Sequence, residues 1–170
     1  MQSKEVEKAM DSEFQIRQFT EDDLESVVNI NRECLPENYP ERFFLGLYKH
    51  APKAFLVATR DGEVVGYIMC RIERGISNFG IRPTKKGHIV SVAVLPDHRR
   101  IGIGRALVDS VMKSMTSYGA DEYFLEVRKT NDAAVSVYQS LGFSIKKTLN
   151  GYYRDGEDAY LMVNKKEEEE

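Results

Sequence analysis

The sequence predicts a single α/β domain with a mixed central sheet of about seven strands and about four helices. Hairpin signals near both ends of the chain flank strand–helix–strand units in the middle, and that order is typical of a mixed sheet. The length of 170 residues suits one core, and 42% hydrophobic with 30% charged residues is ordinary for a globular protein.

Composition limits where the chain is expected to work. No apolar stretch reaches the roughly 18 residues of a membrane-spanning helix, and residues 1–12 lack the apolar core of a signal peptide. We therefore expect a cytoplasmic protein with no membrane partner. Residues 1–12 are expected to be flexible, 13–164 to fold, and the charged stretch 165–170 to be a disordered tail. Cys34 and Cys70 lack a metal-ligand spacing, so free thiols are predicted.

The amino-terminal half predicts a strand, two helices and a hairpin. Thr20 and Asp23 form a variant of the capping box at the start of the first helix, and Asp61-Gly62 is a strong hairpin signal between two apolar runs. The predicted elements are a strand at 14–17, helices ending near 34 and spanning about 41–49, and strands at 54–59 and 64–72.

The second half alternates strands and helices before a closing hairpin. Asn131 is a suitable cap for a short helix, and Gly142 stops that helix. The predicted elements are a polar loop at 75–87, strands at 88–95 and 123–128, a long helix ending near 118, the short helix after 131, and strands at 144–149 and 159–163.

A basic, glycine-spaced loop joins the strand at 88–95 to the long helix, and it reads Arg99-Arg100-Ile101-Gly102-Ile103-Gly104-Arg105. A strand, a short loop and a helix start aim unpaired N–H groups at an anion, and the glycines let the backbone approach it. A P-loop would need Gly-Lys-Ser/Thr, and a dinucleotide-binding loop a small residue where Leu107 stands. The loop is therefore predicted to bind the phosphates of another carrier.

Positive charge is concentrated in the same region. Between Arg82 and Arg105, six Lys and Arg residues face one acid, Asp97. Nucleic acid would explain such a patch, but the patch has neither interleaved aromatic residues nor a recognition motif. We therefore expect no nucleic-acid partner and predict that the patch serves a phosphate-rich cofactor.

The remaining motifs stand in a fixed order around this loop. They are Leu35–Tyr39, Gly87–Val94, Leu125–Arg128 with Asn131 and Tyr138, and Gly151–Tyr153 with Gly156–Tyr160. Together with the Arg-Arg-x-Gly-x-Gly loop they resemble the GNAT acyltransferases from about residue 14 to 163, and most closely the amino-terminal acetyltransferases of the archaeal NatA type. The resemblance implies a single-domain GNAT fold that transfers the acetyl group of acetyl-CoA to the amino termini of proteins or nascent chains.

The same resemblance implies roles for individual residues. The strand at 92–94 pairs with the pantetheine arm, the glycine loop binds the pyrophosphate, and Tyr138 lies beside the coenzyme A sulfur. The implied cofactor-binding residues are Val92, Ala93, Val94, Arg99, Arg100, Ile101, Gly102, Ile103, Gly104, Arg105, Asn131 and Tyr138. The implied substrate-binding residues are Glu37, Tyr39, Tyr152 and Tyr153.

Acetyl transfer needs a group that takes a proton from the amine. An α-amino group has a pKa of about 7.7–8.0, against about 10.4 for lysine, so a modest base acting directly or through water suffices. The candidate catalytic residues are Glu37, His88, Glu126 and, as acid or sulfur hydrogen-bond donor, Tyr138.

His88 and Glu126 are predicted on neighbouring strands, where they could hold a water beside the acetyl group. Strand alternation puts His88 on one face with Val90, Val92 and Val94, and Glu126 on one face with Arg128. Two alternatives stay open: Glu126 pairs with Arg128 or Lys129, or His88 and Glu126 bind a divalent ion. Two ligands are too few for a structural zinc site, so no metal is expected.

The residues do not decide which amine accepts the acetyl group. An acetyltransferase of lysine side chains or small amines would keep the same cofactor, and a non-catalytic acyl-CoA-binding module would need none of the four candidate catalytic residues. Paired tyrosines favour a peptide over a small amine. The preferred first residue, Ser or Ala against Met-Leu, stays open, and an auxiliary subunit is compatible with the sequence without being evident in it.

Overall fold

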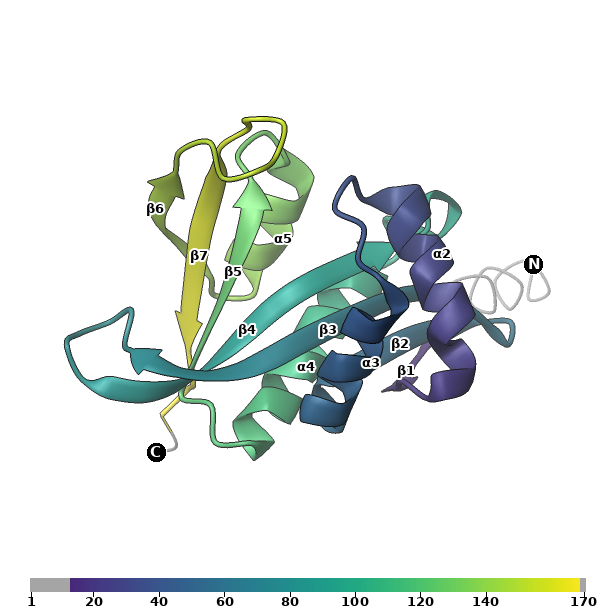
Figure 1. Cartoon of the computed structure of the whole chain (residues 1–170), viewed down its shortest axis with the longest axis horizontal. Helices are drawn as coiled ribbons and strands as arrows, with labels where there is room; N and C mark the ends of the chain where they lie inside the picture. Colours follow the sequence, from purple (N-terminus) through teal and green to yellow (C-terminus); the bar gives the residue numbers. More distant parts are fainter. Residues whose placement is uncertain (1–12, 169–170) are drawn as a thin grey trace, which may run out of the picture.

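The computed structural model describes residues 13–168, which form a seven-stranded sheet covered by helices on both faces (Figure 1). The strand order is β1-β2-β3-β4-β5-β7-β6, and every neighbouring pair is antiparallel except β4 and β5. The strands are β1 Gln15–Gln18, β2 Phe55–Arg60, β3 Glu63–Ile76, β4 Pro83–Val94, β5 Glu122–Arg128, β6 Ser144–Leu149 and β7 Ala159–Lys165. The predicted mixed sheet of seven strands is confirmed.

Four α-helices occur in the described part of the chain, as predicted. They are α2 Leu24–Cys34, α3 Glu41–His50, α4 Ile103–Ser117 and α5 Asp132–Ser140, with 3-10 turns at Glu21–Asp23, Pro52–Ala54 and Pro96–His98. None of the helices in residues 13–168 is long and apolar enough to cross a membrane.

Local signals explain where two of these elements begin and end. The Thr20 N–H donates to Asp23 Oδ2 at 2.8 Å, so the predicted capping box forms, in a 3-10 turn that leads into α2. Asp61 and Gly62 have φ angles of 51° and 78°, the left-handed pair that a two-residue hairpin between β2 and β3 requires.

The apolar core lies in two layers, one on each face of the sheet. On one face, residues of α4 and α5 such as Leu107, Met115 and Tyr138 pack against the strands. On the other, Val27 of α2 and Phe44 of α3 pack against Tyr67. Both layers are needed because β3 and β4 run through the middle of the sheet and are buried from both sides over much of their length.

The predicted polar loop at 75–87 is wrong. β3 and β4 continue as paired strands to Ile76 and Pro83, and only 77–82 form the turn. This hairpin arm projects beyond the helices (Figure 1), so neither face carries the apolar alternation by which a strand is recognised. The buried Glu122 carboxylate fastens the turn, because it accepts from Ser77 Oγ at 2.5 Å and from the Asn78 N–H at 2.7 Å.

The parallel contact between β4 and β5 is short. Only 86–88 pair with 122–124, and beyond His88 and Phe124 the two strands separate (Figure 1). The two strands nevertheless run on to Val94 and Arg128. The main-chain groups on the facing edges of the separated stretches are therefore left without a partner strand.

A bulge in β4 changes which side chains share a face. Met69 pairs with Ser91 and Cys70 with Ile89, so Val90 is the extra residue. Val90 packs in the α2–α3 layer, whereas Val92 and Val94 pack in the α4–α5 layer. The prediction that His88 shares one face with Val90, Val92 and Val94 is therefore wrong, because alternation cannot reveal an inserted residue.

The carboxyl-terminal strand extends past the predicted boundary at 164. Lys165 pairs with Glu122 in β7, and the Lys166 N–H donates to the Asp121 carbonyl at 2.8 Å. The predicted flexible segment 1–12 lies outside the described residues, and so do residues 169 and 170 of the predicted tail.

The first prediction concerns Gly87, where β4 pairs with β5. A Cβ there would lie 2.5 Å from Met115 Sδ and 3.2 Å from Met115 Cβ, so Gly87→Ala must push α4 away from the sheet. We expect a loss of about 1–3 kcal/mol in the free energy of unfolding, measured with urea. Gly75→Ala is the control, because its Cβ would meet only Lys86 Cδ at 3.6 Å. Equal stability of the two variants would contradict the packing argument.

Candidate active site

A pocket of about 340 Å³ occupies the space where β4 and β5 separate. It combines residues that are far apart in the sequence, from the 35–40 loop, from β4 and β5, from α5 and from the turn before β7. Its lining residues are Leu35, Glu37, Tyr39, Ile89, Val90, Ser91, Val92, Leu125, Glu126, Val127, Arg128, Asn131, Tyr138, Tyr152, Tyr153 and Arg154. Eight of the predicted site residues are among them.

The glycine-spaced loop forms a helix start open to an anion. Arg100 and Gly102 adopt φ angles of 66° and 92°, and α4 begins at Ile103. The first hydrogen bond of α4 runs from the Ala106 N–H to the Gly102 carbonyl, which leaves the N–H groups of 103–105 without an intrahelical partner. A Cβ at Gly102 or Gly104 would meet no atom within 4 Å, so space adjoins the backbone there.

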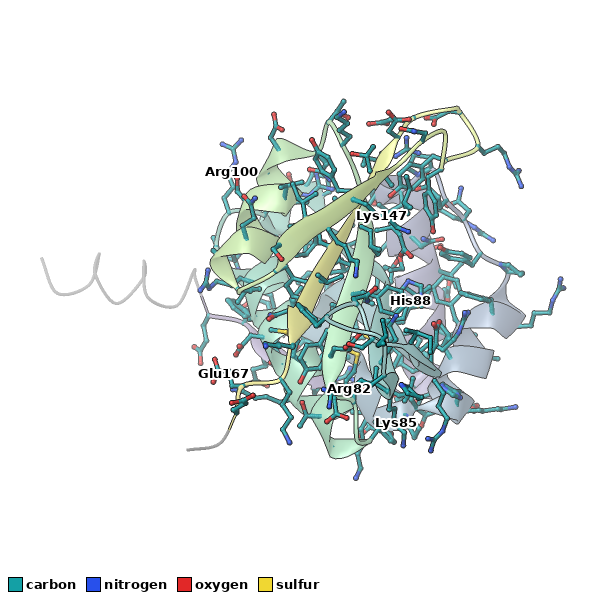
Figure 2. The ribbon with its side chains drawn as sticks, turned by 90° about the vertical axis from the view of Figure 1, so that its left-hand side faces the viewer. Arg82, Lys85, His88, Arg100, Lys147 and Glu167 are labelled. Carbon is teal, nitrogen blue, oxygen red and sulfur yellow. The ribbon has the colours of Figure 1, made fainter. Side chains whose placement is uncertain are left out.

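The basic region between Arg82 and Arg105 is not one patch. Arg82 and Lys85 lie at the far end of β4 from Arg100, as Figure 2 shows, and Lys85 Nζ donates to the Tyr118 carbonyl at 3.0 Å. The prediction that all six cations serve one cofactor is therefore wrong for Arg82, Lys85 and Lys86. Sequence proximity was misleading here because an extended strand separates the two groups.

The end of β4 leads into this loop. Val92 lines the pocket and Ala93 is buried in the α2–α3 layer. The Val94 carbonyl accepts from Arg99 Nε at 2.8 Å and from the Cys34 thiol at 3.7 Å. These bonds anchor the first arginine of the loop to the strand, so the strand end and the helix start hold a fixed position.

His88 and Glu126 come together, as predicted. His88 Nε2 lies 2.7 Å from Glu126 Oε2, and the imidazole stacks on the Phe124 ring at 4.2 Å between centroids. Burial lowers the pKa of His88, but hydrogen bonds and charges from Glu126 and Glu73 outweigh it, so the pKa lies above the usual value. Glu126 lines the pocket and His88 stands directly behind it.

Glu37 is brought into the site by Arg128 of β5. Arg128 Nη2 donates to Glu37, and Nη1 contacts Asp155 at 2.9 Å and Glu157 at 2.5 Å. The guanidinium also lies over the Tyr153 ring, 4.1 Å from its centroid. One arginine therefore ties the 35–40 loop to the turn before β7, across the mouth of the pocket.

A buried asparagine holds the backbone of the 35–40 loop at Glu37 and Tyr39. Asn31 is fully buried, and its Nδ2 donates to the Glu37 carbonyl at 3.0 Å and to Tyr67 Oη at 3.1 Å. Its Oδ1 accepts from the Tyr39 N–H at 3.3 Å, and Tyr67 Oη is 2.7 Å from Ser91 Oγ. The network links helix α2, the loop and the bulged part of β4.

The predicted tyrosines all line the pocket. Tyr39 stacks on Phe43, and Tyr152 meets Tyr153 edge to face. Tyr138 belongs to α5, and burial raises the pKa of its phenol to about 12. Among residues 13–168 the Tyr138 hydroxyl makes no hydrogen bond, so it can donate to a ligand in the pocket.

Sequence reasoning missed Arg128, Glu73 and Asn31 as parts of the site. Arg128 was noted only as a partner for Glu126, which it does not contact; it pairs with Glu37 instead. Asn31 follows Val27 and Val28 at helical spacing, on the apolar face of α2, where a buried polar side chain needs partners, and that spacing is the available signal. Glu73 gave none, because its strand was predicted to end at Ile72, one residue before it.

Three or more His, Cys, Asp or Glu side chains do not converge in metal-binding geometry anywhere in residues 13–168. His88 and Glu126 make a hydrogen-bonded pair instead, and the second His88 nitrogen faces Glu73 at 3.1 Å. Both ring nitrogens are thus engaged by carboxylates.

Comparisons with known proteins identify the family of this chain. The family model for the acetyltransferase (GNAT) family matches residues 24–143. The N-alpha-acetyltransferase of Sulfurisphaera tokodaii is 53% identical over 154 residues, 89% of this chain and 92% of that protein. That of Saccharolobus solfataricus is 49% identical, with 93% and 96% covered. The crystal structure of Ard1 from Thermoplasma volcanium superposes with a TM-score of 0.79 at 34% identity, covering 91% of this chain and 99% of that one.

The fold, the diverging strands and the glycine loop define an acetyltransferase, and the chain belongs to the GNAT family. Within that family it belongs with the N-alpha-acetyltransferases, close to the archaeal Ard1-like enzymes.

The second prediction concerns the arginine that ties the two loops. Arg128→Met removes the partner of Glu37, Asp155 and Glu157, so amide hydrogen exchange in 35–40 and 151–157 should quicken about threefold to tenfold, as expected for a few partly exposed ion pairs. Lys129→Met, which removes the same charge one residue on, is the control. Unchanged exchange in both loops of the Arg128 variant would show that the arginine does not hold them.

Proposed function

We propose that this N-alpha-acetyltransferase transfers the acetyl group directly from acetyl-CoA to the α-amino nitrogen of a protein chain while both substrates occupy the pocket. One observation carries the proposal. A single pocket is lined by Val92 and Asn131, from the expected cofactor side, and by Glu37, Tyr39 and Tyr153, from the expected peptide side.

Members of the GNAT family use acetyl-CoA, and the site has the features to receive it. The free N–H groups at the start of α4, the space beside Gly102 and Gly104, and Arg99, Arg100 and Arg105 suit a pyrophosphate. The unpaired edge of β4 at 92–94 suits the amide groups of the pantetheine arm. We assign these residues, with Ile101, Ile103 and Asn131, to the cofactor.

Attack by a neutral amine forms the amide C–N bond as the thioester C–S bond breaks. An N–H of β4 polarises the thioester carbonyl, because the strand edge beside the pocket is free to donate. The His88–Glu126 pair takes the amine proton through a water, and only Glu126 of the two lines the pocket. Tyr138 donates a hydrogen bond to the departing sulfur, since its raised pKa keeps the phenol protonated.

We assign Glu37 to substrate binding. Its carboxylate is already paired with Arg128, so it is held at the rim and its charge is balanced before the substrate arrives. Tyr39, Tyr152 and Tyr153 surround the same rim and can clamp the first residues of a peptide backbone. A small amine would use none of these side chains.

The third prediction tests the acceptor. Release of coenzyme A is measured with peptides that start in Ser, Ala or Met-Leu, and with a peptide whose amino terminus is blocked and whose lysine is free. We expect turnover only with free amino termini, because an α-amine is deprotonated far more easily than a lysine side chain. Turnover on the blocked peptide would make lysine the acceptor. Binding of acetyl-CoA without turnover on any peptide would point to a small amine or a non-catalytic role.

The fourth prediction tests the base. Glu126→Gln keeps the shape of the side chain but removes the carboxylate that faces the pocket and His88. Since general-base catalysis is worth roughly 100-fold to 10,000-fold, kcat should fall at least about 100-fold with little change in the affinity for acetyl-CoA. Glu33→Gln, on the exposed side of α2, is the control. A kcat within about threefold of the unaltered enzyme would exclude Glu126 as the base.

A further inference from the structure

We propose that Glu73 is a positioning residue: it stabilises the imidazolium form of His88, with Glu126 on the other ring nitrogen, and so sets the pH range in which neutral His88 accepts the amine proton. The inference rests on the proposed function of the pair and concerns a residue outside the pocket. Glu73 belongs to β3, on the far side of His88 from Glu126.

Each of the two ring nitrogens of His88 faces a carboxylate oxygen. Nδ1 lies 3.1 Å from Glu73 Oε1 and Nε2 lies 2.7 Å from Glu126 Oε2. A neutral imidazole has one N–H donor and one lone pair, so one of the two carboxylates would face a lone pair. The imidazolium donates to both. Two carboxylates on a largely buried ring therefore favour the charged form, in agreement with the raised pKa of His88.

Two features fix this arrangement in space. The ring stacks on Phe124 with an angle of 13° between planes, which limits rotation out of line with the carboxylates. β3 and β4 are paired so that Arg71 lies opposite His88, and Glu73, two residues on, projects from the same face as Arg71. Figure 2 shows His88 well away from Arg100 of the glycine-spaced loop.

Other charges near the ring are few. Arg71 Nη1 lies 3.5 Å from Glu73 Oε1, and Lys86 Nζ lies over the Phe124 ring, 4.9 Å from its centroid. Both are positive and oppose the effect of the carboxylates on His88. Since Glu73 makes the direct hydrogen bond, its loss should lower the pKa of His88, whereas loss of Arg71 should raise it.

The effect on catalysis depends on how the pKa of the amine, which donates the proton, compares with that of the histidine, which accepts it. An α-amino group has a pKa of about 7.7–8.0, above the roughly 6.5 of an ordinary histidine. A pair whose histidine binds its proton more tightly is a better acceptor for that amine. The pair accepts when His88 is neutral, re-forms the imidazolium as the amide is made, and then returns the proton to solvent.

The fifth prediction compares Glu73→Gln with the unaltered enzyme. The chain has three histidines, so the imidazole NMR signal of His88 can be assigned with His50→Gln and His98→Gln variants and titrated. We expect the titration of His88 to move to lower pH in Glu73→Gln and to higher pH in Arg71→Gln. The acid limb of the kcat–pH profile should move in the same directions, since the ionisation of the peptide amine is common to all the enzymes.

Glu63→Gln, on the same strand at the turn with β2, is the matched control and should leave both curves in place. Glu73→Asp keeps the charge and should retain most of the normal profile. A lower kcat in Glu73→Gln with unmoved titration and pH profile would overturn the proposal, because a merely structural residue would behave that way. The NMR titration needs no turnover, so it separates failure of this proposal from failure of the proposed function.

Discussion

The site depends on β4 and β5 being held together at one end and apart at the other. Three parallel pairs join them, and Gly87, the middle one on β4, packs against Met115 with no room for a side chain. Beyond His88 the strands separate, which opens the pocket and frees one edge of β4. The bulge at Val90 then turns Val92 and Val94 toward the α4–α5 layer, on the side where the glycine loop begins α4. Sheet geometry thus creates the pocket, the unpaired strand edge and the anion site together.

The carboxylates at the site contact cations before any substrate enters. Arg128 neutralises Glu37 and ties it to Asp155 and Glu157, while His88 stands between Glu73 and Glu126. Carboxylates left unpaired in a half-buried pocket would repel one another and favour protonation. Contact with a cation holds each carboxylate in place. The two glutamates of the pocket differ in their partners. Glu37 is paired with Arg128, which is a permanent cation, whereas Glu126 is paired with His88, which can lose its proton.

The sequence was sufficient for the architecture, because hairpin turns, caps and the glycine loop are local signals, and it named half of the residues that line the pocket. Prediction from the sequence failed for features that depend on contacts between residues distant in the sequence. Most of the arm at 75–87 lies outside the apolar core, so no apolar alternation marks its strands. The bulge at Val90 exists only in the pairing of β3 with β4, and the contact of Arg128 with Glu37 joins residues 91 positions apart. The spacing of Asn31 puts it on the buried face of α2, but its partners come from the loop and from β3, which the spacing does not reveal.

The two glutamates of the pocket are the same residue type, so only their neighbours in the structure can indicate which of them acts as the base. Glu37 and Glu126 are both carboxylates beside the expected position of the amine, and the sequence offers either as the base. A base must release the proton that it gains, and its neighbour determines whether it can. Arg128 stays charged at any working pH and contacts three acids, so a proton on Glu37 would break the contact that closes the pocket mouth. A proton on the His88–Glu126 pair only restores the imidazolium that Glu73 already stabilises. The proposed function therefore assigns proton transfer to β4 and β5 and leaves the 35–40 loop to bind the peptide.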